Sequence, residues 1–318
     1  MTTEKEIDCV VAGSCVVDVL ARPVPLEAAI GRGALVDTEP LRLTTGGIVS
    51  NAAITLARLG MRSAALTYVG NDEWAEVIRR RFAAEGVDTT AVMTNSERAT
   101  SASVVLVDPS GERSFVHYAG AHRLLDKQAL LDRLDLFARS RAMLIGYFPL
   151  FTRLVDDLPE VLTAIRETGC LTAMDAAGDG GTMELLAPML PHLNFYVPSE
   201  REASHQTGLA EHLAMIEAFR AAGATGFLGI KRGAFGATVS PRPGEIFDVP
   251  AVAPPGPVID TTGAGDCFFA ALVTGILRGL SPYDATRLAN AAGACCVTGV
   301  GATTAIRDFA ATADLAGL

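Results

Sequence analysis

The stretch Asp260-Thr261-Thr262-Gly263-Ala264-Gly265-Asp266 stands directly before an apolar segment, 267–277, that has the composition of a buried helix. Two glycines at the start of a helix destabilise it by about 1 kcal/mol each relative to alanine, unless the backbone must approach another group closely. Unpaired N–H groups and the helix dipole favour an anion at this end of a helix. We therefore predict that Gly263, Ala264 and Gly265 stabilise the charge that develops on a phosphoryl group during its transfer.

Asp266 falls in the first turn of the same predicted helix. From this position its carboxylate can accept the proton of a hydroxyl group that attacks the phosphoryl group. In a simpler interpretation, Thr262 caps the helix and Asp266 only complements the helix dipole. The two glycines favour the first interpretation, because a capped helix does not need them. We predict that Asp266 is the catalytic base.

The same stretch matches in full the second signature of the PfkB family of carbohydrate kinases, D-T-x-G-A-G-D. The first signature of that family is recognisable in Gly46-Gly47-Ile48-Val49-Ser50-Asn51-Ala52-Ala53, followed by Leu59-Gly60. The chain thus resembles this family over almost its whole length, from Asp18 near the start to Gly301-Ala302 near the end. The resemblance implies an ATP-dependent kinase that phosphorylates a hydroxyl group of a small molecule.

The resemblance also implies where the substrate binds. Asp18, Gly46, Gly47 and Asn51, together with Asp266, resemble the family residues that hold sugar hydroxyl groups. A carboxylate acceptor and an amide with donors and acceptors suit this role chemically. The simple alternative is that the two glycines form only a turn, with Asn51 a polar residue early in a helix.

A predicted nucleotide site follows from the same resemblance. Relatives carry a glycine-containing loop that borders the nucleotide where this chain has Lys231-Arg232-Gly233-Ala234-Phe235-Gly236. The residues predicted to contact ATP are Lys231, Gly233, Gly236, Gly265 and Asn290. The alternative for this loop is a solvated strand end followed by a hairpin turn.

Glu202 is the candidate for holding a magnesium-bound water. It lies in Ser199-Glu200-Arg201-Glu202, which occupies the place of a family N-x-x-E motif associated with Mg²⁺, with serine in place of asparagine. The pattern S-x-x-E is also a capping box, and the two interpretations are compatible. A monovalent cation such as K⁺, which some relatives use, would lie near Asp260 and Gly301.

Short β-branched runs alternate along the chain with segments of helical period. This alternation predicts a mostly parallel sheet covered by helices. With the resemblance, it predicts an α/β fold of the ribokinase-like type, in three layers and as a single domain over 1–318. The predicted strands are 10–19, 64–69, 143–146, 171–175, 195–197 and 227–231.

One segment breaks the alternation. The runs 101–107 and 112–118 flank Asp108-Pro109-Ser110-Gly111, a composition typical of a tight turn between antiparallel strands. We predict that two segments, about 14–44 and 99–120, form a small β lid that excludes water when it closes. An ordinary hairpin at the edge of the sheet is the alternative. The exposed edges of such a lid favour a homodimer.

Composition restricts the partners. The formal net charge of −10 argues against nucleic acid or an anionic membrane, and no apolar run is long enough to cross a bilayer. The first residues are acidic where a secretory signal is basic, and the six cysteines show no C-x-x-C spacing. These features predict a cytoplasmic protein.

The sequence therefore predicts transfer of the γ-phosphoryl group of Mg-ATP to a hydroxyl of a monosaccharide or sugar derivative. Where ribokinase itself has an acidic sugar contact, this chain has Gly146-Tyr147-Phe148-Pro149, which indicates a less polar pocket. Phe115, His117 and Tyr118 on the predicted lid leave a nucleoside kinase open. A non-catalytic regulatory protein that binds a sugar or nucleotide is the remaining alternative, favoured by Ser199 alone.

Overall fold

The computed structural model describes residues 5–26, 33, 35–110 and 112–318, and within these ranges nine strands form the main sheet. They are β1 (Ile7–Gly13), β4 (Ser63–Gly70), β5 (Val92–Asn95), β8 (Ser140–Gly146), β9 (Leu171–Asp175), β10 (Phe195–Tyr196), β11 (Phe227–Lys231), β12 (Ala237–Ser240) and β13 (Phe247–Val249). Their order is β13-β12-β11-β10-β9-β8-β1-β4-β5. All neighbours from β5 to β11 run parallel, and β12 and β13 add an antiparallel edge.

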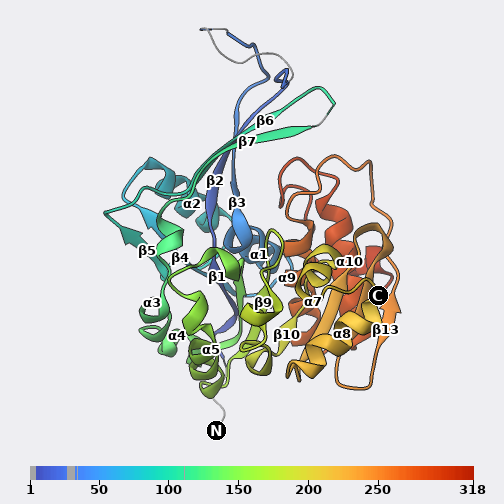
Figure 1. Cartoon of the computed structure of the whole chain (residues 1–318). Coiled ribbons are helices and arrows are strands. Elements are labelled where there is room, and N and C mark those ends of the chain that lie inside the picture. Colours follow the sequence, from blue (N-terminus) through green and yellow to red (C-terminus); the bar gives the residue numbers. More distant parts are fainter. Residues whose placement is uncertain (1–4, 27–32, 34, 111) are drawn as a thin grey trace.

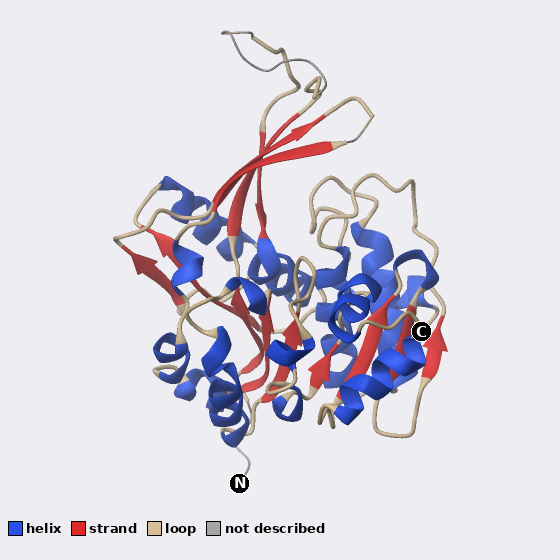
Figure 2. Cartoon of the chain, viewed as in Figure 1, coloured by secondary structure: helices blue, strands red, loops and turns tan. Residues whose placement is uncertain are grey.

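Helices cover both faces of this sheet (Figure 2). Every residue of β1 is buried, and its side chains alternate between two hydrophobic clusters, with Cys9 and Val11 in one and Val10 and Ala12 in the other. One cluster takes in α1 (Gly47–Arg58), α2 (Glu73–Ala84), α9 (Ala264–Leu277) and α10 (Pro282–Cys296), and α11 (Phe309–Ala316) packs against it. The other takes in α3 (Lys127–Leu131), α4 (Leu134–Ala138), α5 (Leu158–Glu167), α6 (Met183–Leu186), α7 (Glu200–Thr207) and α8 (His212–Ala221). The predicted three-layer α/β fold is confirmed.

A second sheet rises from one end of the molecule (Figure 1). Its strands are β2 (Val16–Ala21), β3 (Arg42–Gly46), β6 (Ala102–Val107) and β7 (Arg113–Tyr118), in the order β3-β2-β6-β7. These strands come from the two segments assigned to a lid, and we call them the lid sheet. Residues 27–32, 34 and 111 of those segments lie outside the described residues.

The prediction of one strand over 10–19 was wrong. The chain leaves the main sheet after Gly13 and enters the lid sheet at Val16. Gly13 has a φ of 133°, and a Cβ atom there would lie 2.6 Å from the main-chain oxygen of Gly146. A glycine at position 13 thus lets the chain pass close beside the end of β8 and change direction. An apolar run in the sequence does not reveal this change of direction.

Helices α9 and α10 pack closely, as the small residues of 282–298 indicate. A Cβ atom at Gly275 of α9 would lie 2.8 Å from both Cα and Cβ of Ala285 in α10. This close packing fixes α9, whose first turn carries Asp266. No helix in the described part of the chain is both long and apolar enough to span a membrane.

Candidate active site

Residues 260–265 lead into helix α9 and include its first two residues, and we call them the glycine turn. Gly263 is the N-cap residue, with a φ of 76° and a ψ of 1°, and no side chain caps the helix. A Cβ atom at Gly263 would overlap the Cβ atom of Ala302, so that only glycine fits this backbone. The first N–H groups of a helix have no acceptor within the helix. In α9 no capping side chain accepts hydrogen bonds from them. The turn therefore offers main-chain donors to an anion.

Asp266 is the third residue of α9 and is 4% exposed. Its Oδ2 atom accepts hydrogen bonds from Asn51 Nδ2, at 2.7 Å, and from the hydroxyl of Tyr147, at 2.9 Å. Burial raises the pKa of the Asp266 carboxyl, while the bond from Asn51, the charge of Lys231 and the bond from Tyr147 oppose that rise. A carboxyl group with a raised pKa is a better proton acceptor than an ordinary aspartate.

The residues assigned to the sugar lie where β3 meets α1. Asp18 on β2 stands opposite Thr44 of β3, and its Oδ2 atom occupies the space that a Cβ atom at Gly46 would need. Gly47 has a φ of 77°, and a Cβ atom there would lie 2.5 Å from the main-chain oxygen of Ser14. The tight turn that these glycines allow starts α1, on which Asn51 reaches Asp266. The structure thus brings Asp18, both glycines, Asn51 and Asp266 together.

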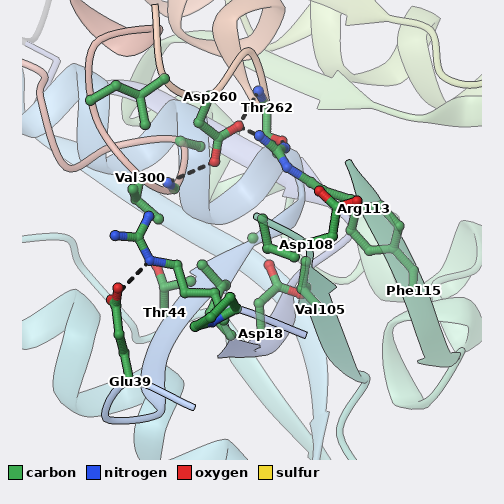
Figure 3. A pocket seen from close by; sticks show the side chains of 18 of the residues that line it. Asp18, Glu39, Thr44, Val105, Asp108, Arg113, Phe115, Asp260, Thr262 and Val300 are labelled. Atoms are coloured by element: carbon green, nitrogen blue, oxygen red, sulfur yellow. Dashed lines mark hydrogen bonds and ion pairs between the residues drawn. The ribbon is translucent and has the colours of Figure 1, made fainter. Parts of the chain in front are cut away.

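A cavity of about 380 Å³ lies between the lid sheet and the glycine turn (Figure 3). Asp18, Thr44, Val105 and Phe115 of the lid sheet line it, whereas Asn51, Asp266, His117 and Tyr118 are not among its lining residues. The glycine turn contributes Asp260 and Thr262 to the same cavity.

Arg113 connects the lid sheet to the glycine turn (Figure 3). Its Nη1 atom lies 2.8 Å from Oδ1 of Asp260 and also donates to the hydroxyl of Thr262. Asp260 accepts two further bonds, from the N–H groups of Thr262 at 2.7 Å and Gly301 at 2.9 Å. Burial raises the pKa of Asp260, but these donors and Arg113 outweigh it and hold the pKa below its usual value. Sequence reasoning missed Arg113, because nothing local links a hairpin residue to a turn 147 residues later.

Lys231 and Asp175 form a buried ion pair beside the glycine turn. Lys231 Nζ lies 2.9 and 3.2 Å from the two carboxylate oxygens of Asp175, and 3.3 Å from where a Cβ atom at Gly265 would stand. Burial lowers the pKa of Lys231, but Asp175 and Glu202 raise it by more, so that the ammonium group stays charged. Asp175 was not among the predicted site residues. The sequence feature that could have identified Asp175 is an acidic residue at the carboxyl end of a buried parallel strand, because parallel sheets bind ligands at that end.

Glu202 forms the capping box that its sequence pattern indicates. Its Oε2 atom accepts from the N–H group of Ser199, at 2.7 Å, and from the Ser199 hydroxyl, at 2.8 Å. The charge of Glu202 also raises the pKa values of Asp175, Lys231 and Asp266. Glu202 therefore lies near the same site as these three residues. Among the described residues, no cluster of three or more histidine, cysteine, aspartate or glutamate side chains could hold a metal ion.

A second cavity, of about 640 Å³, lies on the other side of the glycine turn. Its walls are mostly apolar, and they include all five residues assigned to the nucleotide: Lys231, Gly233, Gly236, Gly265 and Asn290. The amide of Asn290 donates to the main-chain oxygen of Pro250, at 3.0 Å, and so fixes the loop after β13. An apolar pocket with a few polar groups suits a flat aromatic base joined to phosphates.

Residues 6–308 match the family described as "pfkB family carbohydrate kinase". The chain belongs to this family. It is 29% identical to a ribokinase of Haemophilus influenzae over 284 residues, which are 83% of this chain and 85% of that protein. It is also 28% identical to a fructokinase of Klebsiella pneumoniae over 277 residues, 82% and 88% of the two chains.

The fold of this kinase matches that of solved relatives. The structure of Arabidopsis thaliana ribokinase complexed with ribose and ATP superposes with a TM-score of 0.85, at 22% identity, covering 98% of this chain and 99% of that one. The predicted family, the ribokinase-like fold and the predicted class of enzyme, a carbohydrate kinase, are confirmed.

Proposed function

We propose that this kinase transfers the γ-phosphoryl group of Mg-ATP to a hydroxyl group of a neutral monosaccharide. The observation that carries this proposal is the place of the glycine turn between two cavities. Asp260 and Thr262 line the cavity under the lid sheet, whereas Thr261, Ala264 and Gly265 line the apolar one. The acceptor binds on the first side, with its reactive hydroxyl reaching past the cavity lining to Asp266, and ATP binds on the second side, so that the phosphoryl group passes along the turn.

The proposed chemistry uses main-chain donors and one base. Asp266 accepts the proton of the acceptor hydroxyl, whose oxygen forms a bond to the γ-phosphorus as the bond to the ADP oxygen breaks. The N–H groups of the glycine turn stabilise the charge on the phosphoryl oxygens, and the ammonium group of Lys231 adds a positive charge nearby. The products are ADP and a phosphorylated sugar.

The residues present fit a magnesium ion that arrives with the nucleotide. Mg²⁺ usually keeps several waters and binds one or two carboxylates together with the substrate phosphates, so a cluster of three protein ligands is not required. Glu202 would hold one of its waters, and the ion would neutralise charge on the phosphates.

The monovalent cation fits less well. Both carboxylate oxygens of Asp260 already accept hydrogen bonds, and Arg113 supplies a positive charge there. A monovalent cation at this carboxylate would therefore compete with the guanidinium group of Arg113, and the proposed reaction does not use one.

The charges in the cavity under the lid sheet favour a neutral acceptor. Both arginines among the described lining residues are paired with a carboxylate, Arg22 with Glu39 at 3.0 Å and Arg113 with Asp260 at 2.8 Å. The carboxylate of Asp18 adds a further acceptor for hydroxyl groups. Among the described residues that line the cavity, a sugar acid or a sugar phosphate would therefore find no unpaired cation. Phe115, whose side chain is exposed in this cavity, is the one observation that favours a nucleoside.

The proposal is tested by measuring ADP formation with Mg-ATP across neutral monosaccharides, sugar acids, sugar phosphates and nucleosides. We expect turnover with one or a few neutral monosaccharides and little with charged sugars. Turnover confined to nucleosides would move the assignment to a nucleoside kinase. Binding of ATP and sugar without ADP formation would contradict the kinase mechanism.

We also propose a homodimer that forms through the lid sheet. One face of this sheet carries a row of apolar side chains, since Leu43, Val19, Val104 and Val116 stand opposite one another across the four strands. Leu43, Val104 and Val116 are 56%, 40% and 65% exposed. The neighbouring residues, Asp18 among them, point to the other face, toward the cavity. A second copy that covers the apolar row would remove it from water.

Val116→Glu is expected to turn the dimer into a monomer, because the glutamate would place a charge at the β7 end of the apolar row. Sedimentation of both proteins measures this directly. Leu213→Glu is the matched control, since Leu213 is 52% exposed on α8, outside the lid sheet, and its substitution should leave the mass unchanged. A wild-type protein that sediments as a monomer at micromolar concentration would contradict the proposed dimer.

The cysteines support a cytoplasmic location, which we also propose. All six are buried free thiols. Free thiols persist in a reducing compartment, which is also where ATP is available to a kinase.

A further inference from the structure

Tyr147 directly follows β8 and has an unusual backbone conformation. Its φ is 66° and its ψ is 38°, and among the described residues it is the one non-glycine residue with a positive φ. Side chains with a Cβ atom avoid this left-handed region, and such residues concentrate at functional sites. The N–H group of Tyr147 donates to the main-chain oxygen of Asp175, at 3.0 Å, which holds the strained residue in place.

This backbone directs the Tyr147 side chain at the base. Its hydroxyl lies 2.9 Å from Oδ2 of Asp266, the atom that also accepts from Asn51 Nδ2 at 2.7 Å. The ring packs against both hydrophobic clusters, so the phenol has little freedom to turn away. Burial raises the pKa of Tyr147 well above its usual value, and the phenol is therefore neutral and able to donate.

We propose that Tyr147 is a positioning residue for the base: its phenol and the Asn51 amide hold Asp266 by Oδ2, so that Oδ1 faces the acceptor hydroxyl. This inference rests on the proposed function. A carboxylate that receives two donors on one oxygen from two different elements is fixed in orientation. The donated bonds also favour its ionised form, which is the form that accepts a proton.

The other groups that act on Asp266 come from several elements. Lys231 at the end of β11 favours the ionised carboxylate, and Glu202 on α7 and Asp175 at the end of β9 disfavour it. Cys296 on α10 is a further titratable neighbour, and its bond to Cys267 together with burial raises the pKa of its thiol, which stays protonated. Removal of the Tyr147 hydroxyl changes none of these charges, so that its effect can be measured alone.

Tyr147→Phe tests the inference because it removes one oxygen atom and keeps the ring and its packing. We expect kcat to fall about tenfold, with little change in the KM of either substrate, since the hydrogen bond to a charged group is lost. In the pH profile of kcat, the acid limb should move to higher pH by about 1 unit. Loss of the Tyr147 hydroxyl as a donor favours the protonated form of the Asp266 carboxyl and so raises its pKa. A merely structural role would lower stability without moving this limb.

Tyr196→Phe is the matched control. The Tyr196 hydroxyl is also buried, but its partner is the side chain of Gln206, at 2.9 Å, and not a carboxylate. This variant should keep the wild-type acid limb, and thermal unfolding should show that both variants are folded. An active Tyr147→Phe protein with an unchanged limb would overturn the inference alone. A wild-type protein that forms no ADP with any acceptor would overturn the proposed function, and this inference with it.

Discussion

Replacing Asp266 with asparagine is expected to lower kcat by about 10²- to 10⁴-fold, the usual contribution of a general base. An amide cannot accept the hydroxyl proton. Its oxygen can still accept from Asn51 and Tyr147, so the side chain should stay where the carboxylate lies. Binding of ATP and sugar should persist, and thermal stability should be kept or raised, because the buried charge is removed. Steady-state kinetics, equilibrium binding and thermal unfolding measure the three effects.

Asp284→Asn is the control that separates catalysis from helix capping. Asp284 is the third residue of α10, the position that Asp266 has in α9, and it is hydrogen-bonded to the hydroxyl of Ser281, at 2.7 Å. If Asp266 only complemented the helix dipole, both substitutions would lower stability alike and neither would affect kcat. An Asp266→Asn protein with kcat within a few-fold of wild type would therefore contradict the assigned base.

Gly263→Ala is expected to impair both folding and catalysis. The added Cβ atom would overlap Ala302 and stand 3.0 Å from the amide nitrogen of Asn51, and the residue would keep a positive φ. The left-handed conformation and the overpacking together should lower the free energy of unfolding by about 2 to 4 kcal/mol. The N–H groups of the glycine turn would move, and the loss of one such donor lowers kcat by about 10²- to 10³-fold. Denaturant unfolding and kinetics at saturating substrate measure these changes.

Gly208→Ala measures the backbone effect alone. Gly208 follows α7 with a φ of 70°, and a Cβ atom there would meet nothing within 4 Å. This variant should lose about 1 to 2 kcal/mol of stability and keep its kcat. If Gly263→Ala lost only as much stability and remained fully active, the tight approach between the glycine turn and Ala302 would have no role in catalysis.

Much of the candidate site could be predicted because its chemistry requires particular residues in a short stretch. Only glycine fits the backbone at 263 and at 47, so these positions stand out in the sequence. The five residues assigned to the nucleotide all line one cavity, although nothing local shows that 231–236 and 290 lie together. Their predicted proximity came from the family resemblance and not from the pattern of the residues.

The side-chain partners could not be predicted in the same way. Lys231 was predicted to contact ATP, but the structure pairs it with Asp175, at the end of a strand 56 residues earlier. Arg113 reaches the glycine turn only because the tertiary fold brings the β6–β7 hairpin and this turn to the same cavity. Tyr147 was interpreted as a loss of polarity, whereas its hydroxyl is bonded to the base.

By itself the sequence determined the alternation of strands and helices, the glycine turn with its aspartate, and therefore the family. These features depend on residues close together in the chain, where hydrophobic period and backbone sterics act locally. Only the tertiary structure decided that β1 ends at Gly13, that Asp260 is paired with Arg113, and that Asp266 is held by Asn51 and Tyr147. Such pairings depend on the order and register of strands that lie far apart in the chain, and no local pattern of residues encodes these.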